Sequence, residues 1–329
     1  MLLSAAAIVF IWRTQGAGLN FNTLSTLLHP NLLGALGAVA VIFLWWGFAG
    51  LRLKLLAQDM GGQVTLSRAI RAYLLGLFSA SVTPAATGSS LATGWYLGRY
   101  LTSGQAAGIA IYTIVLDLVF YVWALPAAFI VLVANGVDLG IPGLGWYVTV
   151  FAVFAAGLSW SLAFRLMAVK RVLFQVMKLR ALRRRRKPAL RFLERTRKVL
   201  AEFNGMSLAA QLGLHGATTL LYFFHFLAFN MVAVALGISV NHVNIIALQV
   251  LVVALSFLVP TPGGSGYFEV ALGVALSGQV PAQAKVLLIL VWRLVSYWLY
   301  FIIGPAIGGM ALLRGGGAGK SVANQETPV

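Results

Sequence analysis

Apolar runs of about 18 residues or more recur along this chain of 329 residues, and each is long enough to cross a membrane as a helix. Only 9% of the residues are charged, and the mean hydropathy is +0.90. A soluble domain carries roughly 25% charged residues, so this chain has too few to cover a water-exposed surface. The sequence therefore predicts an all-α, polytopic integral membrane protein, a helical bundle surrounded by lipid.

The basic residues are concentrated in one place. Of the 24 Lys and Arg residues, 14 lie within residues 165–198, in a loop between two apolar runs. The net charge of +17 is therefore typical of a cytoplasmic loop that obeys the positive-inside rule, and it does not indicate nucleic acid as a partner. We expect this loop to contact anionic lipids.

A single transmembrane domain is expected over residues 1–313, with a cytoplasmic polybasic loop at 169–206 and a short cytoplasmic tail at 314–329. Trp and Tyr cluster near several ends of the apolar runs, where interfacial belts place them. The candidate membrane segments are 31–51, 72–98, 104–133, 145–167, 208–236, 243–259, 267–276 and 284–313.

The charges of the loops set the direction of each segment. A basic loop before segment 72–98 should be cytoplasmic, whereas the connection 135–145 has no Lys or Arg and should face outward. Segment 104–133 then runs outward, so segment 72–98 must begin and end on the cytoplasmic side. By the same reasoning, segment 243–276 begins and ends outside. The basic residues of the first loop are Arg52, Lys54, Arg68 and Arg71.

Both of these segments are interrupted by proline and glycine near their centres. Proline removes a backbone donor and clashes with the preceding turn, and glycine releases the chain. The sequence therefore predicts two oppositely oriented re-entrant helical hairpins, the sign of an inverted-topology repeat whose substrate site lies between the broken helices. The candidate substrate-binding residues at the breaks are Thr83, Pro84, Thr87, Gly88 and Ser89 in the first, and Thr261, Pro262, Gly263, Gly264, Ser265 and Gly266 in the second.

Of the charged residues inside predicted membrane segments, three join the candidate site: Asp117, Glu269 and Arg293. Such charges are expensive in a bilayer and are functional candidates by default. Structural roles are open for each of them. Glu269 stands three residues after Gly266 and could cap a half-helix, Arg293 could only pair with Glu269, and Asp117 could bond neighbouring hydroxyls or indoles.

The sequence predicts neither a metal site nor a cofactor. It contains no cysteine, which excludes disulfides and thiolate ligands. His215 and His225 share a segment, but a spacing of ten does not place them on one helix face, so we expect them to make polar contacts in the core.

Several of these residues together resemble a known family. They are Arg52, the Thr-Pro-x-x-Thr-Gly run at 83–88, the Pro-Thr-Pro-Gly-Gly-Ser-Gly-x-x-Glu run at 260–269, and Arg293. The pattern is similar to the flippase-like family, also called the lysylphosphatidylglycerol synthase transmembrane region, over essentially the whole chain. The resemblance implies an integral membrane protein that moves or handles lipids and lipid-linked glycans, with family motif positions at Gly263, Gly264, Gly266, Glu269 and Arg293.

The chain departs from that family in two respects. Many relatives have Gly-Gly and an acidic residue at the first break, whereas this chain has Thr87-Gly88-Ser89-Ser90. The synthase domain of bifunctional relatives is also missing, so we expect no synthase activity and no enzyme.

The leading hypothesis is a lipid translocase in the bacterial inner (plasma) membrane that moves an anionic phospholipid or a polyprenyl-phosphate-linked lipid between leaflets. Half-helix N-termini near Ser89 and Ser265 would bind a phosphate, Arg293 would supply the counter-charge, and Glu269 or Asp117 would couple a proton or an ammonium. One alternative is a membrane-embedded lipid glycosyltransferase or transferase, which would need clustered carboxylates. Another is a non-transporting scaffold for enzymes of envelope-lipid synthesis.

Overall fold

The computed structural model describes residues 31–137, 143–164, 205–257, 259 and 261–314, and every regular element in these ranges is a helix. The prediction of an all-helical protein is therefore confirmed for the described part of the chain. The predicted polybasic loop and C-terminal tail lie almost entirely outside the described residues.

Among the described residues, four helical segments are long and apolar enough to cross a membrane. Helix α7 (Leu144–Phe164) is also apolar and packs against one of them, α6. The four segments are α3 (Leu32–Asp59), α6 (Ser103–Ala134), α10 (Leu208–Ala235) and the column formed by α13 (Ala282–Arg293), the π-helical turn η4 (Leu294–Trp298) and α14 (Tyr300–Arg314).

Local sequence signals explain where the helices begin. Five helices start after an Asn, Ser or Thr whose side-chain oxygen accepts a hydrogen bond from a backbone N–H of the first turn. Such caps satisfy donors that the helix itself leaves free and contribute about 0.5–2 kcal/mol each. The capping residues are Asn31, Thr65, Thr102, Ser207 and Asn241.

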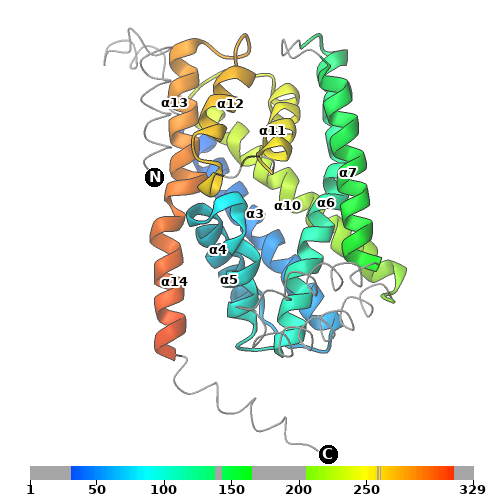
Figure 1. Cartoon of the computed structure of the whole chain (residues 1–329). Coiled ribbons are helices and arrows are strands. Elements are labelled where there is room, and N and C mark those ends of the chain that lie inside the picture. Colours follow the sequence, from blue (N-terminus) through cyan, green and yellow to red (C-terminus); the bar gives the residue numbers. More distant parts are fainter. Residues whose placement is uncertain (1–30, 138–142, 165–204, 258, 260, 315–329) are drawn as a thin grey trace, which may run out of the picture.

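Two segments are interrupted near the predicted positions, and each consists of two helices joined by a short turn. The first consists of α4 (Leu66–Val82), the 3₁₀ turn η1 (Pro84–Ala86) and α5 (Gly88–Leu97). The second consists of α11 (His242–Ser256), the 3₁₀ turn η3 (Pro262–Gly264) and α12 (Tyr267–Ala275). Figure 1 shows α4 and α5 in the lower half of the molecule and α11 and α12 in the upper half, and η1 contacts η3 between them. We call the two pairs the first and second hairpin.

The two breaks share a local geometry. Each opens with Thr-Pro, forms a short 3₁₀ turn and has a positive φ two residues after the proline, +54° at Ala86 and +63° at Gly264. A positive φ is uncommon outside glycine. In the first break the Thr83 hydroxyl accepts a hydrogen bond from the Gly88 N–H at 2.8 Å, which caps α5.

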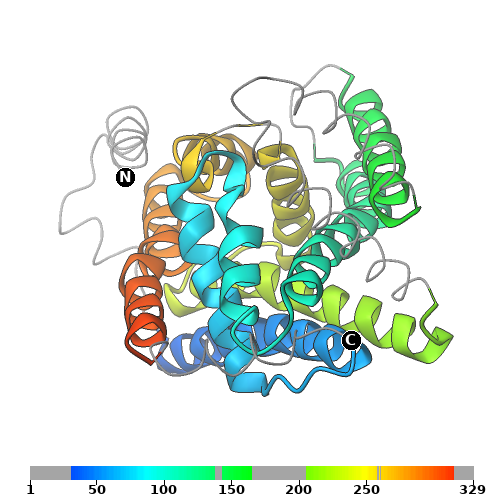
Figure 2. The ribbon, with the colours of Figure 1, turned by 60° about the horizontal axis from the view of Figure 1, so that its bottom comes forward.

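The first hairpin lies in the centre of the bundle. Figure 2 shows α4 and α5 in the middle of the view, with α3, α6 and α14, which contact this hairpin, around them and α7 at the periphery. Helix α14 packs closely on α4, because a Cβ at Gly304 would lie 2.2 Å from the Phe78 side chain. Only a glycine permits this approach.

One detail of the predicted segments was wrong. Helix α3 continues to Asp59 and α4 begins at Leu66, so the four basic residues assigned to the first loop lie within helices: Arg52, Lys54, Arg68 and Arg71. The helix tolerates Arg52 because this side chain has an acidic partner on α6. The last span is interrupted by the π turn directly after Arg293, and such turns are frequent at functional sites.

Candidate functional site

A cavity of about 240 Å³ lies where the two hairpins meet the last span. Its walls come from α4, from the second hairpin and from the π turn, with further residues from α3 and α10. Among the candidate site residues of the second break, Thr261, Gly263 and Gly264 line it, as does Arg293. The structure therefore brings these predicted residues together around one internal space.

The tips of the hairpins touch at Gly263. Its φ is +56°, and a Cβ at this position would lie 3.0 Å from the Ser81 Cα and 2.5 Å from the Tyr297 ring. The Tyr297 hydroxyl lies 3.3 Å from the Ser81 carbonyl oxygen and donates a hydrogen bond to it. Glycine at 263 thus allows the second hairpin, the first hairpin and the last span to meet at one point.

Glu269 and Arg293 form a buried ion pair, of which Arg293 lines the cavity and Glu269 does not. The Arg293 Nε donates to Glu269 Oε1 at 2.8 Å, and Glu269 Oε2 accepts a hydrogen bond from the Gly266 N–H at 2.8 Å. Both structural roles considered for Glu269, capping and pairing, are therefore present. The Arg293 guanidinium also lies 4.3 Å from the centroid of the Tyr297 ring, a cation–π distance.

Three polar atoms around the second break are buried and have no hydrogen-bond partner among the described residues. They are Thr261 Oγ1, Ser265 Oγ and Arg293 Nη2. Because a buried polar atom without a partner costs about 1–3 kcal/mol, such atoms call for water or a ligand. Two hydroxyls and a guanidinium nitrogen together can donate three hydrogen bonds, which suits an oxyanion.

The wall contributed by α3, α10 and α13 is aromatic. The Trp45 and His225 rings are tilted against each other with centroids 4.3 Å apart, and the Trp292 and His225 centroids are 5.9 Å apart. All three line the cavity together with Tyr300. This wall was not predicted from the sequence, and His225 was expected to lie in the core, because aromatic residues at helical spacing in a membrane span ordinarily indicate packing.

The residues predicted at the first break lie outside the cavity. Thr83, Pro84, Thr87, Gly88 and Ser89 are absent from its lining, which instead takes Ser81 and Ala86 from this hairpin. Thr83 and Thr87 bond backbone atoms within the break. Ser89 packs toward α4, since a Cβ at Gly76 would lie 3.2 Å from its hydroxyl oxygen. Their visible roles are structural.

Asp117 likewise lies away from the cavity. Its Oδ1 accepts a hydrogen bond from Arg52 Nη1, so its partner is an arginine and not the hydroxyls or indoles that we considered. Sequence could not reveal this pair, because 65 residues separate its members. The ion pair links α3 to α6.

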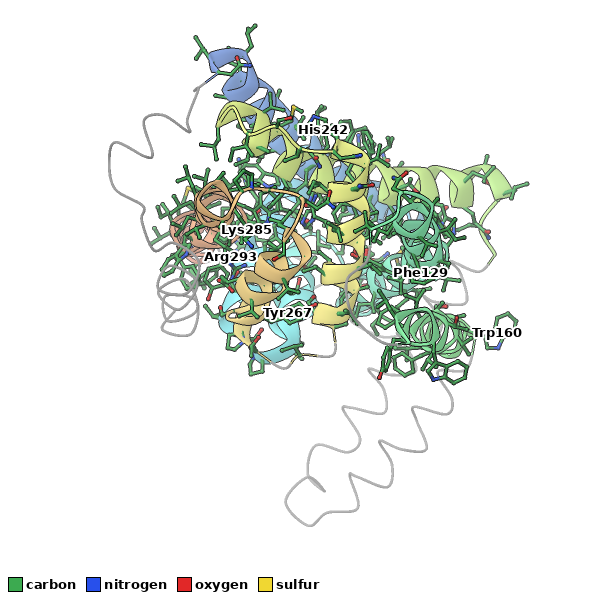
Figure 3. All side chains as sticks on the ribbon, turned by 90° about the horizontal axis from the view of Figure 1, so that it is seen from above. Phe129, Trp160, His242, Tyr267, Lys285 and Arg293 are labelled. Carbon is green, nitrogen blue, oxygen red and sulfur yellow. The ribbon has the colours of Figure 1, made fainter. Side chains whose placement is uncertain are left out.

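The charged residues of the second half are concentrated near α13. Figure 3 shows Lys285 and Arg293 close together in projection, with Tyr267 on the neighbouring α12, and Phe129 and Trp160 on the opposite side of the bundle. Glu269 is the acidic partner of Arg293, whereas the Lys285 Nζ donates to the Ser277 hydroxyl at 3.1 Å. Within the described ranges, no three His, Asp or Glu side chains gather closely enough to hold a metal.

Spanning helices around a cavity with a buried ion pair define a class: a helical membrane protein with several spans and an internal polar site. Residues 1–304 match the family described as the lysylphosphatidylglycerol synthase TM region, and the chain belongs to this family. It is thus a multi-pass integral membrane protein. It is also similar to a UPF0104 membrane protein from Archaeoglobus fulgidus, with 24% identity over 344 residues that cover 99% of each chain.

Proposed function

We propose that the two hairpins are re-entrant and belong to an inverted-topology repeat. The order and lengths of the helices support this. Helices α3 and α10 each have 28 residues, α4 and α11 have 17 and 15, and α5 and α12 have 10 and 9. Each hairpin is followed by a long span. In such folds the substrate binds between the broken helices, where the cavity lies here.

We further propose that the first hairpin enters from the cytoplasm and the second from outside, in the plasma membrane of a bacterium. The positive-inside rule supports this orientation, because Arg68, Arg71 and Arg99 all lie at the base of the first hairpin. The polybasic loop and the C-terminus would then be cytoplasmic as well.

The function that this geometry supports best is translocation of a lipid with an anionic head group, a phospholipid or a polyprenyl-phosphate-linked lipid, rather than catalysis. One observation carries the proposal: Thr261 Oγ1, Ser265 Oγ and Arg293 Nη2 are buried at the hairpin junction with no hydrogen-bond partner among the described residues. Thr261 and Arg293 line the cavity, so the oxygens of a phosphate held there would accept hydrogen bonds from these two side chains, whereas Ser265 is not a lining residue. Rocking of one repeat against the other would expose this site to each leaflet in turn.

The size of the cavity supports a head group as the occupant. Its volume of about 240 Å³ lies below the roughly 300–1,000 Å³ of pockets that enclose drug-sized ligands. A phosphate with a small substituent fits such a space, and the acyl chains would remain in the bilayer. The Glu269–Arg293 pair keeps the site near neutrality before the lipid enters, because each charge offsets the other.

The test is a flip assay with the purified protein in proteoliposomes. Lipids with a fluorescent acyl chain and either a phosphatidylglycerol or a phosphatidylcholine head group are exposed to a reductant that bleaches only the outer leaflet. We expect faster bleaching of the inner-leaflet pool for phosphatidylglycerol. Equal rates for both head groups, or the rate of protein-free vesicles, would overturn the proposal.

Variants of the two hydroxyls refine this test. We expect Thr261→Val and Ser265→Ala to slow translocation without loss of stability, because neither hydroxyl has a protein partner to lose among the described residues. Thr218→Val is the matched control. Its hydroxyl is also buried, but it bonds Leu214 within α10, away from the cavity, so translocation should be unchanged.

A further inference from the structure

A second, smaller pocket lies at the base of the first hairpin, away from the central cavity. It encloses about 40 Å³ between α4, the end of α5 and the last turns of α14. Arg71, Arg99, Tyr96 and Tyr100 provide its polar lining, and Ile307 and Met310 of α14 provide an apolar edge. The pocket therefore combines guanidinium groups, phenols and apolar surface at one end of the bundle.

Contacts within this cluster hold the basic side chains in place. The Arg99 Nη1 donates a hydrogen bond to the Ala311 carbonyl oxygen, which ties the base of the hairpin to α14. Arg68 lies 4.4 Å from the centroid of the Tyr100 ring, and the Tyr96 and Tyr100 rings are 6.0 Å apart. The cation–π contact and the packing of the two tilted rings restrict these side chains, so less entropy is lost when a ligand binds.

The cluster formed by the polar lining residues and Arg68 carries a net positive charge. Arg68, Arg71 and Arg99 lie within it, and none of the described residues that line the pocket is acidic. Arginine presents planar donors that match the oxygens of a phosphate, and phenols add further donors. Aromatic residues beside basic ones are also typical of the level at which lipid head groups lie. An anion with an attached apolar chain meets all of these features.

We propose that this pocket binds the phosphate of an anionic phospholipid from the adjacent leaflet, with an acyl chain against the apolar edge at Ile307 and Met310. Arg71 and Arg99 bind the phosphate oxygens, and Arg68 adds to the attractive field. The inference concerns a site distinct from the central cavity and holds whether or not the protein translocates lipid.

The close contact between α4 and α14 lies between this pocket and the cavity, with Gly308 facing Leu75 and Gly304 facing Phe78. At its inner end this contact reaches Tyr297 and Ser81, at the cavity. The pocket is therefore a site separate from the cavity.

Binding is tested on the purified full chain in detergent with three probes: dihexanoyl-phosphatidylglycerol, dihexanoyl-phosphatidylcholine and inorganic phosphate. The titration compares the parent with Arg68→Gln/Arg71→Gln, and Lys54→Gln serves as a control that removes a basic charge outside the pocket. We expect the double variant to bind phosphatidylglycerol about thirty-fold more weakly, at roughly five-fold for each arginine near a head group. The control should bind as the parent does.

The results of this titration support or overturn the proposed phospholipid site. Equal affinity of the double variant and the control for phosphatidylglycerol would overturn it. Binding of inorganic phosphate as tight as that of phosphatidylglycerol would assign the pocket to free phosphate, and equal binding of phosphatidylcholine would remove the preference for an anionic lipid. If the double variant fails to fold, Arg71→Gln, which alters one exposed side chain, gives the same comparison. Repeating the titration in a cavity variant, Arg293→Gln/Glu269→Gln, separates this site from the proposed translocation site.

Discussion

Neutralising one member of the Glu269–Arg293 pair should destabilise the protein strongly. Glu269 is 0% and Arg293 3% exposed, so either residue alone would be an uncompensated buried charge. Removing one partner of a buried pair costs about 3–5 kcal/mol. A glutamine at 269 can still accept from the Gly266 N–H, so loss of the cap does not add to this figure. At roughly 2–4 °C per kcal/mol, each single variant should lower Tm by on the order of 10 °C.

The double variant Glu269→Gln/Arg293→Gln separates structure from binding. It leaves no buried charge, so we expect its thermal stability to return close to that of the parent. If Arg293 binds the anionic head group, however, this stable variant should be unable to translocate lipid. Arg293→Lys should retain part of the activity, because lysine keeps the charge but lacks the planar fork. The measurements are thermal unfolding in detergent and lipid translocation in proteoliposomes.

One result would refute a role for the Glu269–Arg293 pair in binding the head group. A double variant that is stable and translocates lipid at the parental rate would show that the pair is only structural, and the anion site would then have to consist of the hydroxyls alone. The Arg52–Asp117 pair is the matched control, since it is an ion pair between helices that does not line the cavity. Arg52→Gln/Asp117→Asn should therefore leave the preference for anionic lipids unchanged.

Three further predictions follow from the hairpins. Gly263→Ala should abolish translocation, because its Cβ would collide with Tyr297. Gly61 also has a positive φ but faces open space, so the control Gly61→Ala should translocate lipid and lose only about 1–2 kcal/mol of stability. Equal translocation by the two variants would refute the steric argument. Single cysteines at 102 and 279, introduced into this cysteine-free chain, should label from opposite sides of the membrane, and labelling of both from outside would make the first hairpin a plain span. Tyr297→Phe should lower the free energy of unfolding by about 1 kcal/mol in chemical denaturation. Unchanged stability would show that the hydrogen bond from Tyr297 to the first hairpin does not stabilise the fold.

The sequence by itself determined the class of protein and the position of both breaks. Hydropathy is a local property, and the lack of charged residues allows no soluble alternative. Proline and glycine act on the backbone near their own positions, so Thr-Pro at 83–84 predicted the end of α4 and the run at 260–266 predicted the break between α11 and α12. The capping role of Glu269 was also accessible, because a carboxylate three residues after Gly266 reaches that N–H within one turn.

Only the tertiary structure decided which distant groups meet. The Tyr297–Ser81 hydrogen bond spans 216 residues of sequence, and the Arg52–Asp117 pair spans 65. Contacts of this kind depend on how helices pack, and periodicity within one helix carries no information on the partner that its buried face will find. For the same reason, the sequence could not place Trp45 and His225 on a cavity wall. In a membrane span, an aromatic residue that lines a cavity and one that faces a neighbouring helix have the same local sequence pattern.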